Sequence, residues 1–248
     1  MLLAEGLMCG AGSQQLGPEP SAPVHPPGTG SRTLVLNSAD GPPFSRADGT
    51  GIIDLVLKEI FRRVGIEIRI LAVPAERALR NASEGDEDGI FSRIAGMSEK
   101  YPGLVQVPEK LVDFEFVAFS KKIDVEMKGW ESLQPYEVAI ITGWKILEEN
   151  IRNTVSLHKV RDVNTLFNLL ASDRVEMVVY SRLGGEATIR DLGLKGVKTL
   201  EPPLASREMF LYLNRKHAGL VATVSESLRK MKEDGAYQRI MGHLNRHN

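Results

Sequence analysis

Two short segments of the chain end in the same type of tripeptide, an aromatic residue followed by serine and arginine. They are Phe91-Ser-Arg93 and Tyr180-Ser-Arg182. When the surrounding residues 82–96 and 171–185 are compared at one constant offset, Ala-Ser, Ser-Arg and the final glycine coincide. A guanidinium group binds a carboxylate or a phosphate through two parallel hydrogen bonds. Arg93 and Arg182 therefore predict a site for an anionic small molecule, to which each copy contributes one cation. The alternative is that each arginine only holds a loop in place.

Three further candidates precede the first copy in the chain. Arg77 follows Pro74, which opens a predicted helix whose free backbone N–H groups also suit an anion. Phe44 follows two prolines and would present a rigid apolar face to a ligand, unless it packs in the core. Asp40 either accepts a hydrogen bond from a ligand or caps the turn in which it lies.

The second half of the chain supplies an equivalent group. Thr142-Gly-Trp144 ends a predicted strand and opens a predicted helix, so its hydroxyl and backbone N–H groups suit an anion. Trp144 and Tyr180 are candidates for stacking on a ligand. For both aromatic residues the alternative is a place in the hydrophobic core.

The elements that must position these residues follow from the apolar periodicity. We predict strands over residues 33–37, 66–73, 89–91, 114–119, 136–142, 154–157, 175–180 and 209–213. We predict helices over residues 51–64, 74–84, 144–151, 163–170, 220–232 and 237–244. Alternation of strands and helices is typical of parallel α/β architecture, in which ligands bind beyond the carboxyl ends of the strands.

The composition excludes several classes of protein. The 248 residues carry a formal net charge of −1, so no basic field indicates a nucleic-acid partner. A single cysteine, Cys9, excludes an internal disulfide and any zinc site with several cysteines. No phosphate-binding loop, dinucleotide fingerprint or nucleophile elbow is present. His243 and His247 lack a nearby acid, and we predict no metal and no cofactor.

Residues 1–31 differ from the rest of the chain. They hold five of the 13 prolines and no lysine or arginine, which predicts a flexible leader and a possible remnant of a signal peptide. Cys9 follows a short apolar stretch and is a candidate for bacterial lipid attachment. The alternative is a non-native N-terminus, with the mature fold beginning near Arg32.

Several short motifs occur together in a characteristic order. They are Asp40-Gly-Pro-Pro-Phe44, Gly51-Ile-Ile-Asp54, Glu76-Arg-Ala-Leu79, Asp88-Gly-Ile-Phe-Ser-Arg93, Tyr101-Pro-Gly-Leu-Val-Gln-Val-Pro108, Leu170-Ala-Ser-Asp-Arg-Val175 and Leu228-Arg-Lys-Met-Lys-Glu-Asp-Gly235. Over about residues 32–244 the chain resembles bacterial extracellular solute-binding proteins, in the amino-acid-type branch with the type 2 periplasmic-binding fold. The resemblance implies an α/β protein of two lobes joined by two hinge crossovers, near residues 116–122 and 207–213.

The resemblance also implies a division of the chain and a place for the ligand. Lobe 1 would comprise residues 32–119 plus 208–248, and lobe 2 residues 120–207, with the ligand between them. In this family an arginine after a threonine-rich turn usually binds the ligand carboxylate, so Lys100 or Arg93 would take that role here. The family's acid for the ligand ammonium is missing at residues 180–182, which favours an anionic ligand.

The function that the resemblance implies is binding, without catalysis, of a small polar or anionic solute, amino-acid-like or a carboxylate. We expect a periplasmic monomer that delivers this solute to a membrane permease of the ABC transporter type. One alternative is a sensory ligand-binding domain. Another is an enzyme similar to cyclohexadienyl dehydratase, in which Glu76, Glu115 or Glu186 would be the cleft acid.

Overall fold

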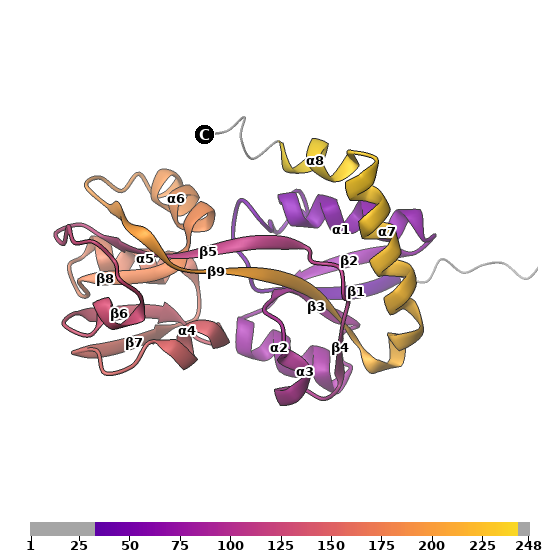
Figure 1. The fold of residues 1–248 in the computed structure, drawn as a ribbon, viewed down its shortest axis with the longest axis horizontal. Helices are drawn as coiled ribbons and strands as arrows, with labels where there is room; N and C mark the ends of the chain where they lie inside the picture. The colour runs from indigo at the N-terminus through magenta and orange to yellow at the C-terminus, as the bar shows by residue number, and fades with distance from the viewer. Residues whose placement is uncertain (1–32, 243–248) are drawn as a thin grey trace, which may run out of the picture. The chain divides into compact units, whose positions relative to one another are not determined.

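The structure is a computed structural model that describes residues 33–242 (Figure 1). The predictions for the leader, for Cys9 and for the two C-terminal histidines lie outside the described residues.

One mixed sheet forms the framework, with the strand order β2-β1-β3-β9-β5-β8-β6-β7, and β4 pairs with β9. Its strands are β1 (Thr33–Ser38), β2 (Glu67–Ala72), β3 (Gly89–Arg93), β4 (Leu104–Gln106), β5 (Val112–Ser120), β6 (Glu137–Ile141), β7 (Ser156–Val160), β8 (Met177–Ser181) and β9 (Lys198–Asn214). The α-helices are α1 (Ile52–Arg63), α2 (Ala75–Glu84), α3 (Met97–Lys100), α4 (Lys145–Asn150), α5 (Val163–Ala171), α6 (Arg182–Asp191), α7 (Val221–Glu233) and α8 (Ala236–Met241). Two 3₁₀ helices are η1 (Trp130–Leu133) and η2 (Arg215–Leu220).

The two halves of this sheet have the same internal order. In one half β1 pairs in parallel with β2 and β3, and β3 then pairs antiparallel with β9. In the other half β6 pairs in parallel with β7 and β8, and β8 then pairs antiparallel with β5. Strands β3 and β8 therefore hold equivalent positions, and they carry the two matching segments that end in Arg93 and Arg182.

Strands β5 and β9 run side by side between the two halves (Figure 1). Their antiparallel register extends from Val112 opposite Met209 to Ser120 opposite Lys198. The predicted strand over residues 209–213 covers only the last part of β9. Pro202 and Pro203 lie in its first part and interrupt the strand pattern in the sequence. Proline has no N–H to donate to a ladder, and the β5–β9 register shifts beside this pair of prolines.

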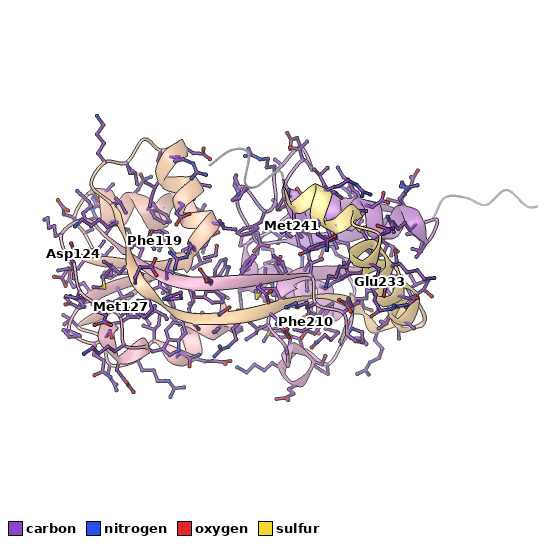
Figure 2. All side chains as sticks on the ribbon, turned by 45° about the horizontal axis from the view of Figure 1, so that its top comes forward. Phe119, Asp124, Met127, Phe210, Glu233 and Met241 are labelled. Carbon is purple, nitrogen blue, oxygen red and sulfur yellow. The ribbon has the colours of Figure 1, made fainter. Side chains whose placement is uncertain are left out.

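The hydrophobic core extends through both halves. Phe119 lies near one end of the β5–β9 pair and Phe210 near the other (Figure 2). The ring of Phe119 packs edge-on against Phe167 of α5, with centroids 5.3 Å apart. Phe210 belongs to a second cluster with Ala78 and Leu79 of α2, so each half has apolar packing of its own.

The start of α1 anchors the turn that follows β1. Its buried face holds Ile53, Val56 and Ile60, in agreement with the predicted helical stripe. Asp54 Oδ2 accepts hydrogen bonds from the backbone N–H groups of Gly51 (3.0 Å) and Arg46 (2.9 Å). The first contact completes the capping of α1 at Gly51, and the second ties the preceding turn to the helix.

Helix α6 was not predicted, because Gly184 and Gly185 weaken helical propensity. Both glycines lie in close packing, since a Cβ at Gly185 would overlap the ring of Phe119. Arg182 is therefore the first residue of a helix. None of the helices between residues 33 and 242 is long and apolar enough to cross a membrane.

Candidate functional site

The candidate site begins with an acid and a base at the ends of neighbouring strands. Asp40 lies two residues after β1, and Arg93 is the last residue of β3. Because Asn37 stands opposite Ile90 in the parallel register, the same spacing continued places Asp40 opposite Arg93. The sheet thus brings together two residues that are 53 positions apart in the sequence.

Both charged groups of this pair are buried, and most of their polar atoms lack a partner. The two carboxylate oxygens of Asp40, and Nε and Nη2 of Arg93, have no hydrogen bond of good geometry to any described residue, although the nearby Ser92 hydroxyl also acts to lower the pKa of Asp40. Burial raises the pKa of Asp40 to about 6, although the positive charge of Arg93 opposes the shift. Burial likewise lowers the pKa of Arg93, against the attraction of Asp40. Buried polar groups are normally hydrogen-bonded, so this pair can accommodate further partners.

A cavity of about 260 Å³ opens beside Asp40. It lies at the carboxyl ends of β1, β2, β6, β7 and β8, where the parallel arrangement predicts a ligand. Among the residues that line it are Asp40, Gly41, Pro74, Arg161, Val163 and Tyr180.

An aromatic pair separates this cavity from a second, smaller one of about 20 Å³. Tyr180 lines the first cavity, whereas Trp144 and Arg93 line the second. The Trp144 indole stacks on the Tyr180 ring and meets Phe116 edge-on. Its Nε1–H group is buried and has no acceptor among the described residues. Burial, together with the charge of Asp40, raises the pKa of Tyr180, so its hydroxyl remains protonated at neutral pH.

An ion pair connects the two halves of the sheet beside these cavities. Lys145 Nζ of α4 lies 2.5 Å from Glu76 Oε2 of α2, and the Tyr101 hydroxyl donates to Glu76 Oε1 at 3.2 Å. Lys145 also contacts Glu148 Oε2 at 3.1 Å. Burial alone would lower the pKa of Lys145, but its hydrogen bonds to both glutamates raise it overall. The Lys145 ammonium group therefore stays charged, and its ion pair with Glu76 links α4 to α2.

The backbone at Gly143 approaches α2 even more closely. Gly143 has a φ of +87°, and a Cβ placed there would lie 2.5 Å from the backbone nitrogen of Glu76. Only glycine combines this backbone conformation with such a close approach. The segment Thr142-Gly-Trp144 thus touches the beginning of α2, as well as opening α4.

The remaining candidates occupy different environments. Phe44 is 2% exposed and packs against Phe114, with ring centroids 4.4 Å apart, so it lies in the core. The backbone N–H of Thr142 donates to Val160, and the neighbours of Thr142 on each side line one cavity each. Arg77 is exposed on α2 and lines neither cavity.

Arg182 does not lie beside Arg93 at the cavities. Its Nε is 2.5 Å from Glu115 of β5, its Nη2 is 2.8 Å from Glu201 of β9, and its Nη1 also pairs with Glu201. The hydrogen bonds to Glu201, and those to Glu115, raise its pKa despite partial burial. The guanidinium is satisfied by this triad, which connects both central strands to α6. A role of Arg182 in ligand binding stays a prediction that this placement does not favour.

Two of the acids considered for an enzyme are engaged elsewhere. Glu76 pairs with Lys145, and Glu115 with Arg182. Glu186 lies half-buried on α6 and lines neither cavity. Between residues 33 and 242 no group of three or more His, Cys, Asp or Glu residues is placed to hold a metal ion.

Arg161 lines the cavity beside Asp40, and the sequence did not identify it as a candidate. We predicted that the strand before it ends at Leu157, because His158 and Lys159 are polar. In the structure β7 continues to Val160, so Arg161 lies directly at its carboxyl end. Ligands of parallel sheets bind beyond the carboxyl ends of the strands. A predicted strand that extended to Val160 would therefore have made Arg161 a candidate.

Comparisons with known proteins support the fold. No protein-family model matches the chain. An uncharacterized protein of Shewanella oneidensis is 24% identical over 195 residues, which are 75% of this chain and 73% of that protein.

Solved structures are similar over most of the chain. A mutant of ArgBP from T. maritima has a TM-score of 0.73 and 21% identity, covering 86% of this chain and 94% of that one. The GluR0 ligand-binding core in complex with L-glutamate has a TM-score of 0.76 and 13% identity, covering 87% and 99%. A histidine kinase sensor domain with similarity to periplasmic binding proteins has a TM-score of 0.72 and 17% identity, covering 86% and 96%. Together with the strand order, these likenesses confirm the predicted fold: the chain has the two-lobed α/β, type 2 periplasmic-binding fold with two hinge crossovers.

Proposed function

We propose that the protein is a non-catalytic binding protein that captures a small polar solute in the cavity beside Asp40. The observation that carries this proposal is the pair of buried charged groups of Asp40 and Arg93, most of whose polar atoms have no hydrogen-bond partner among the described residues. A buried polar group without a partner costs roughly 1–3 kcal/mol, and more when it is charged. A bound ligand with complementary groups would recover that free energy.

The chemistry of the pair indicates which solutes fit. The Arg93 guanidinium suits a carboxylate, and the Asp40 carboxylate suits an ammonium or hydroxyl group. The acid that is missing at residues 180–182 is thus available from the turn after β1, in the other half of the sheet. This favours a zwitterionic, amino-acid-like solute over a purely anionic one.

The ArgBP and GluR0 likenesses support small-solute binding, because those proteins are named for arginine and bound to L-glutamate, respectively. We propose an extracytoplasmic monomer that delivers its solute to an ABC-type permease. In this proposal residues 32–119 and 208–248 form lobe 1, residues 120–207 form lobe 2, and β5 and β9 act as the hinge. The likeness to a histidine kinase sensor domain supports the alternative of a sensory role.

An enzyme on the same scaffold is favoured by one observation. A buried carboxyl group whose pKa is raised to about 6 can act as a general acid or base near neutral pH. Asp40, rather than the three glutamates considered above, would be that group. Turnover of prephenate-like substrates by the purified chain, lost in Asp40→Asn, would replace binding with catalysis as the function.

The test is calorimetric titration of the purified full chain with the twenty L-amino acids and with small dicarboxylates. We expect at least one of them to bind with micromolar or lower Kd. Arg93→Met should weaken this binding by at least about 30-fold, because it leaves the ligand carboxylate buried and unpaired. Arg174→Met, at an exposed arginine after α5, is the matched control. Unchanged affinity in Arg93→Met would remove this residue from the site.

A parallel variant, Arg182→Met, separates the two arginines that the sequence made equivalent. Because Arg182 holds Glu115 and Glu201 together, its loss should lower the Tm of the protein. We expect the Kd of the ligand to change less than about twofold, because Arg182 lines neither cavity and its ion pairs lie elsewhere. A large rise in Kd without a fall in Tm would show that Arg182 contacts the ligand.

A further inference from the structure

Arg161 is a charged residue of the cavity for which the fold supplies no partner. It follows β7 directly, lines the same cavity as Asp40 and Tyr180, and is exposed. Within residues 33–242 its guanidinium forms no ion pair and no hydrogen bond. Exposed arginines are often held by a neighbouring acid, so its neighbours decide whether it is available to a ligand.

The adjacent acid is already engaged. Asp162 is the N-cap of α5, where its Oδ1 accepts from the backbone N–H of Thr165 and its Oδ2 from the Thr165 hydroxyl, each at 2.8 Å. An N-cap of this kind stabilises the helix by about 1 kcal/mol, which holds the carboxylate in place. The carboxylate of the other charged residue in the cavity lining, Asp40, is buried and interacts with Arg93.

The beginning of α2 contributes to the same cavity. Pro74 and Ala75 line it, and no side chain caps this helix N-terminus. The partial positive charge of a helix N-terminus favours an anionic group nearby. The cavity therefore combines a buried acid, Asp40, with an exposed cation, Arg161, and an uncapped helix N-terminus.

We propose that Arg161 determines ligand specificity by binding a second acidic group of the solute. The inference rests on the proposed binding function, and it names the solute class as acidic amino acids. In this arrangement Asp40 receives the ammonium group and Arg161 the side-chain carboxylate in the cavity that both residues line. Arg93, which lines the adjoining smaller cavity and interacts with Asp40, binds the other carboxylate beside Asp40. The cavity volume of about 260 Å³ lies below the roughly 300–1,000 Å³ of pockets for drug-sized ligands, which suits so small a molecule.

Amides provide the discriminating probes, because L-asparagine and L-glutamine match L-aspartate and L-glutamate in shape but lack the second charge. Titration of the full chain with all four should show at least one acid binding about tenfold more tightly than its amide. Arg161→Gln should abolish this preference by weakening the acid about tenfold, with the amide changing less than twofold. Arg161→Lys, which keeps the charge, should retain part of the preference. Arg174→Gln removes an exposed arginine elsewhere and should retain all of it.

The outcomes separate this inference from the proposed function. If the wild-type chain binds amides as tightly as acids, or if Arg161→Gln keeps the preference, the role of Arg161 is wrong while solute binding stands. If none of the four probes binds, acidic amino acids are excluded as the solute class. The wider panel of amino acids and dicarboxylates then decides separately whether the protein binds solutes at all.

Discussion

The indole ring of Trp144 stacks on the phenol ring of Tyr180, with ring centroids 4.5 Å apart and planes inclined by 21°. Phe116 of β5 meets the same indole edge-on at 5.9 Å. Trp144 is thus held from two sides, between the cavity beside Asp40 and the smaller cavity beside Arg93. The side chains of the protein itself fill the middle of the candidate site, and the cavity of about 260 Å³ lies beside them.

Truncation of Trp144 should therefore cost stability. The side chain is 4% exposed, and Trp→Ala changes in a core cost about 3–5 kcal/mol. We expect Trp144→Ala to lower the free energy of unfolding by that amount in urea titrations. Trp144→Phe, which keeps an aromatic ring on Tyr180, should lose clearly less. Equal losses in the two variants would show that stacking does not hold this residue.

The same residue offers a direct reporter of binding. The chain has two tryptophans, so Trp130→Phe leaves Trp144 as the single indole fluorophore. A ligand at Asp40 and Arg93 should alter the emission of Trp144 with the same Kd as calorimetry gives. A spectrum that stays constant at saturating ligand would place the ligand elsewhere.

The ion pair between Lys145 and Glu76 should favour approach of the two halves of the sheet. Partly exposed pairs contribute about 0–1 kcal/mol, and 1 kcal/mol corresponds to about a fivefold change in a two-state ratio. Lys145→Met should raise the Kd of the ligand by up to about fivefold, and small-angle scattering should report a more extended ligand-free protein. Lys159→Met is the matched control, because Lys159 pairs with Glu148 inside one half. If Lys145→Met and Lys159→Met change the Kd and the scattering equally, the Lys145–Glu76 pair contributes only to local stability.

A side chain at position 143 should keep the same two halves apart. The added Cβ in Gly143→Ala would lie 2.5 Å from the Glu76 nitrogen, so the backbone must shift. Gly193→Ala is the matched control, because its φ of +62° imposes a similar conformational strain with no atom within 4 Å of the new Cβ. Both variants should lose about 1 kcal/mol of stability from the positive φ. Only Gly143→Ala should also weaken ligand binding, and we expect its Kd to rise at least tenfold. Equal Kd values for the two variants would contradict the close approach of Gly143 to α2.

The buried carboxyl of Asp40 should make stability depend on pH. Its pKa rises from the ordinary 3.8 to about 6 in the folded protein, so the folded chain holds a proton that the unfolded chain has lost. The free energy of unfolding should fall as the pH rises from about 4 to 6, and the deficit should persist above pH 6. Two pKa units correspond to about 3 kcal/mol at most.

Asp40→Asn tests this dependence. The variant should be more stable than the wild type at pH 7 and equally stable near pH 4, as measured by urea unfolding at each pH. Asp191→Asn, at the exposed last residue of α6, should follow the wild-type curve. If Asp40→Asn also follows that curve, the carboxyl does not titrate in this range.

Local patterns in the sequence were sufficient for most of the framework. The apolar stripe from Ile53 to Ile60 has the period of a helix, and the runs that became β1, β6 and β8 are short and rich in branched residues. Such patterns depend on neighbours in the chain, so they are legible without a structure. These patterns were misleading where residues that disfavour an element locally are accommodated by the fold. Examples are the prolines within β9 and the two closely packed glycines of α6.

The repeated tripeptide shows that the sequence predicts the position of an arginine in the fold but not its partners. The topology gives Arg93 and Arg182 equivalent strands, as their matching segments indicated. Their partners differ, because Arg93 faces Asp40 in a buried setting while Arg182 meets Glu115 and Glu201. Those acids come from strands that only the folded sheet brings near, and no local pattern identifies them.

By itself, the sequence determined that this is an α/β protein of two similar halves with candidate ligand groups at the strand ends. The tertiary structure alone decided which of these groups meet: Asp40 with Arg93, Trp144 with Tyr180, and Lys145 with Glu76. The physical reason is that secondary structure follows from side-chain periodicity over a few residues. The environment of a charge depends instead on burial and on partners distant in the chain.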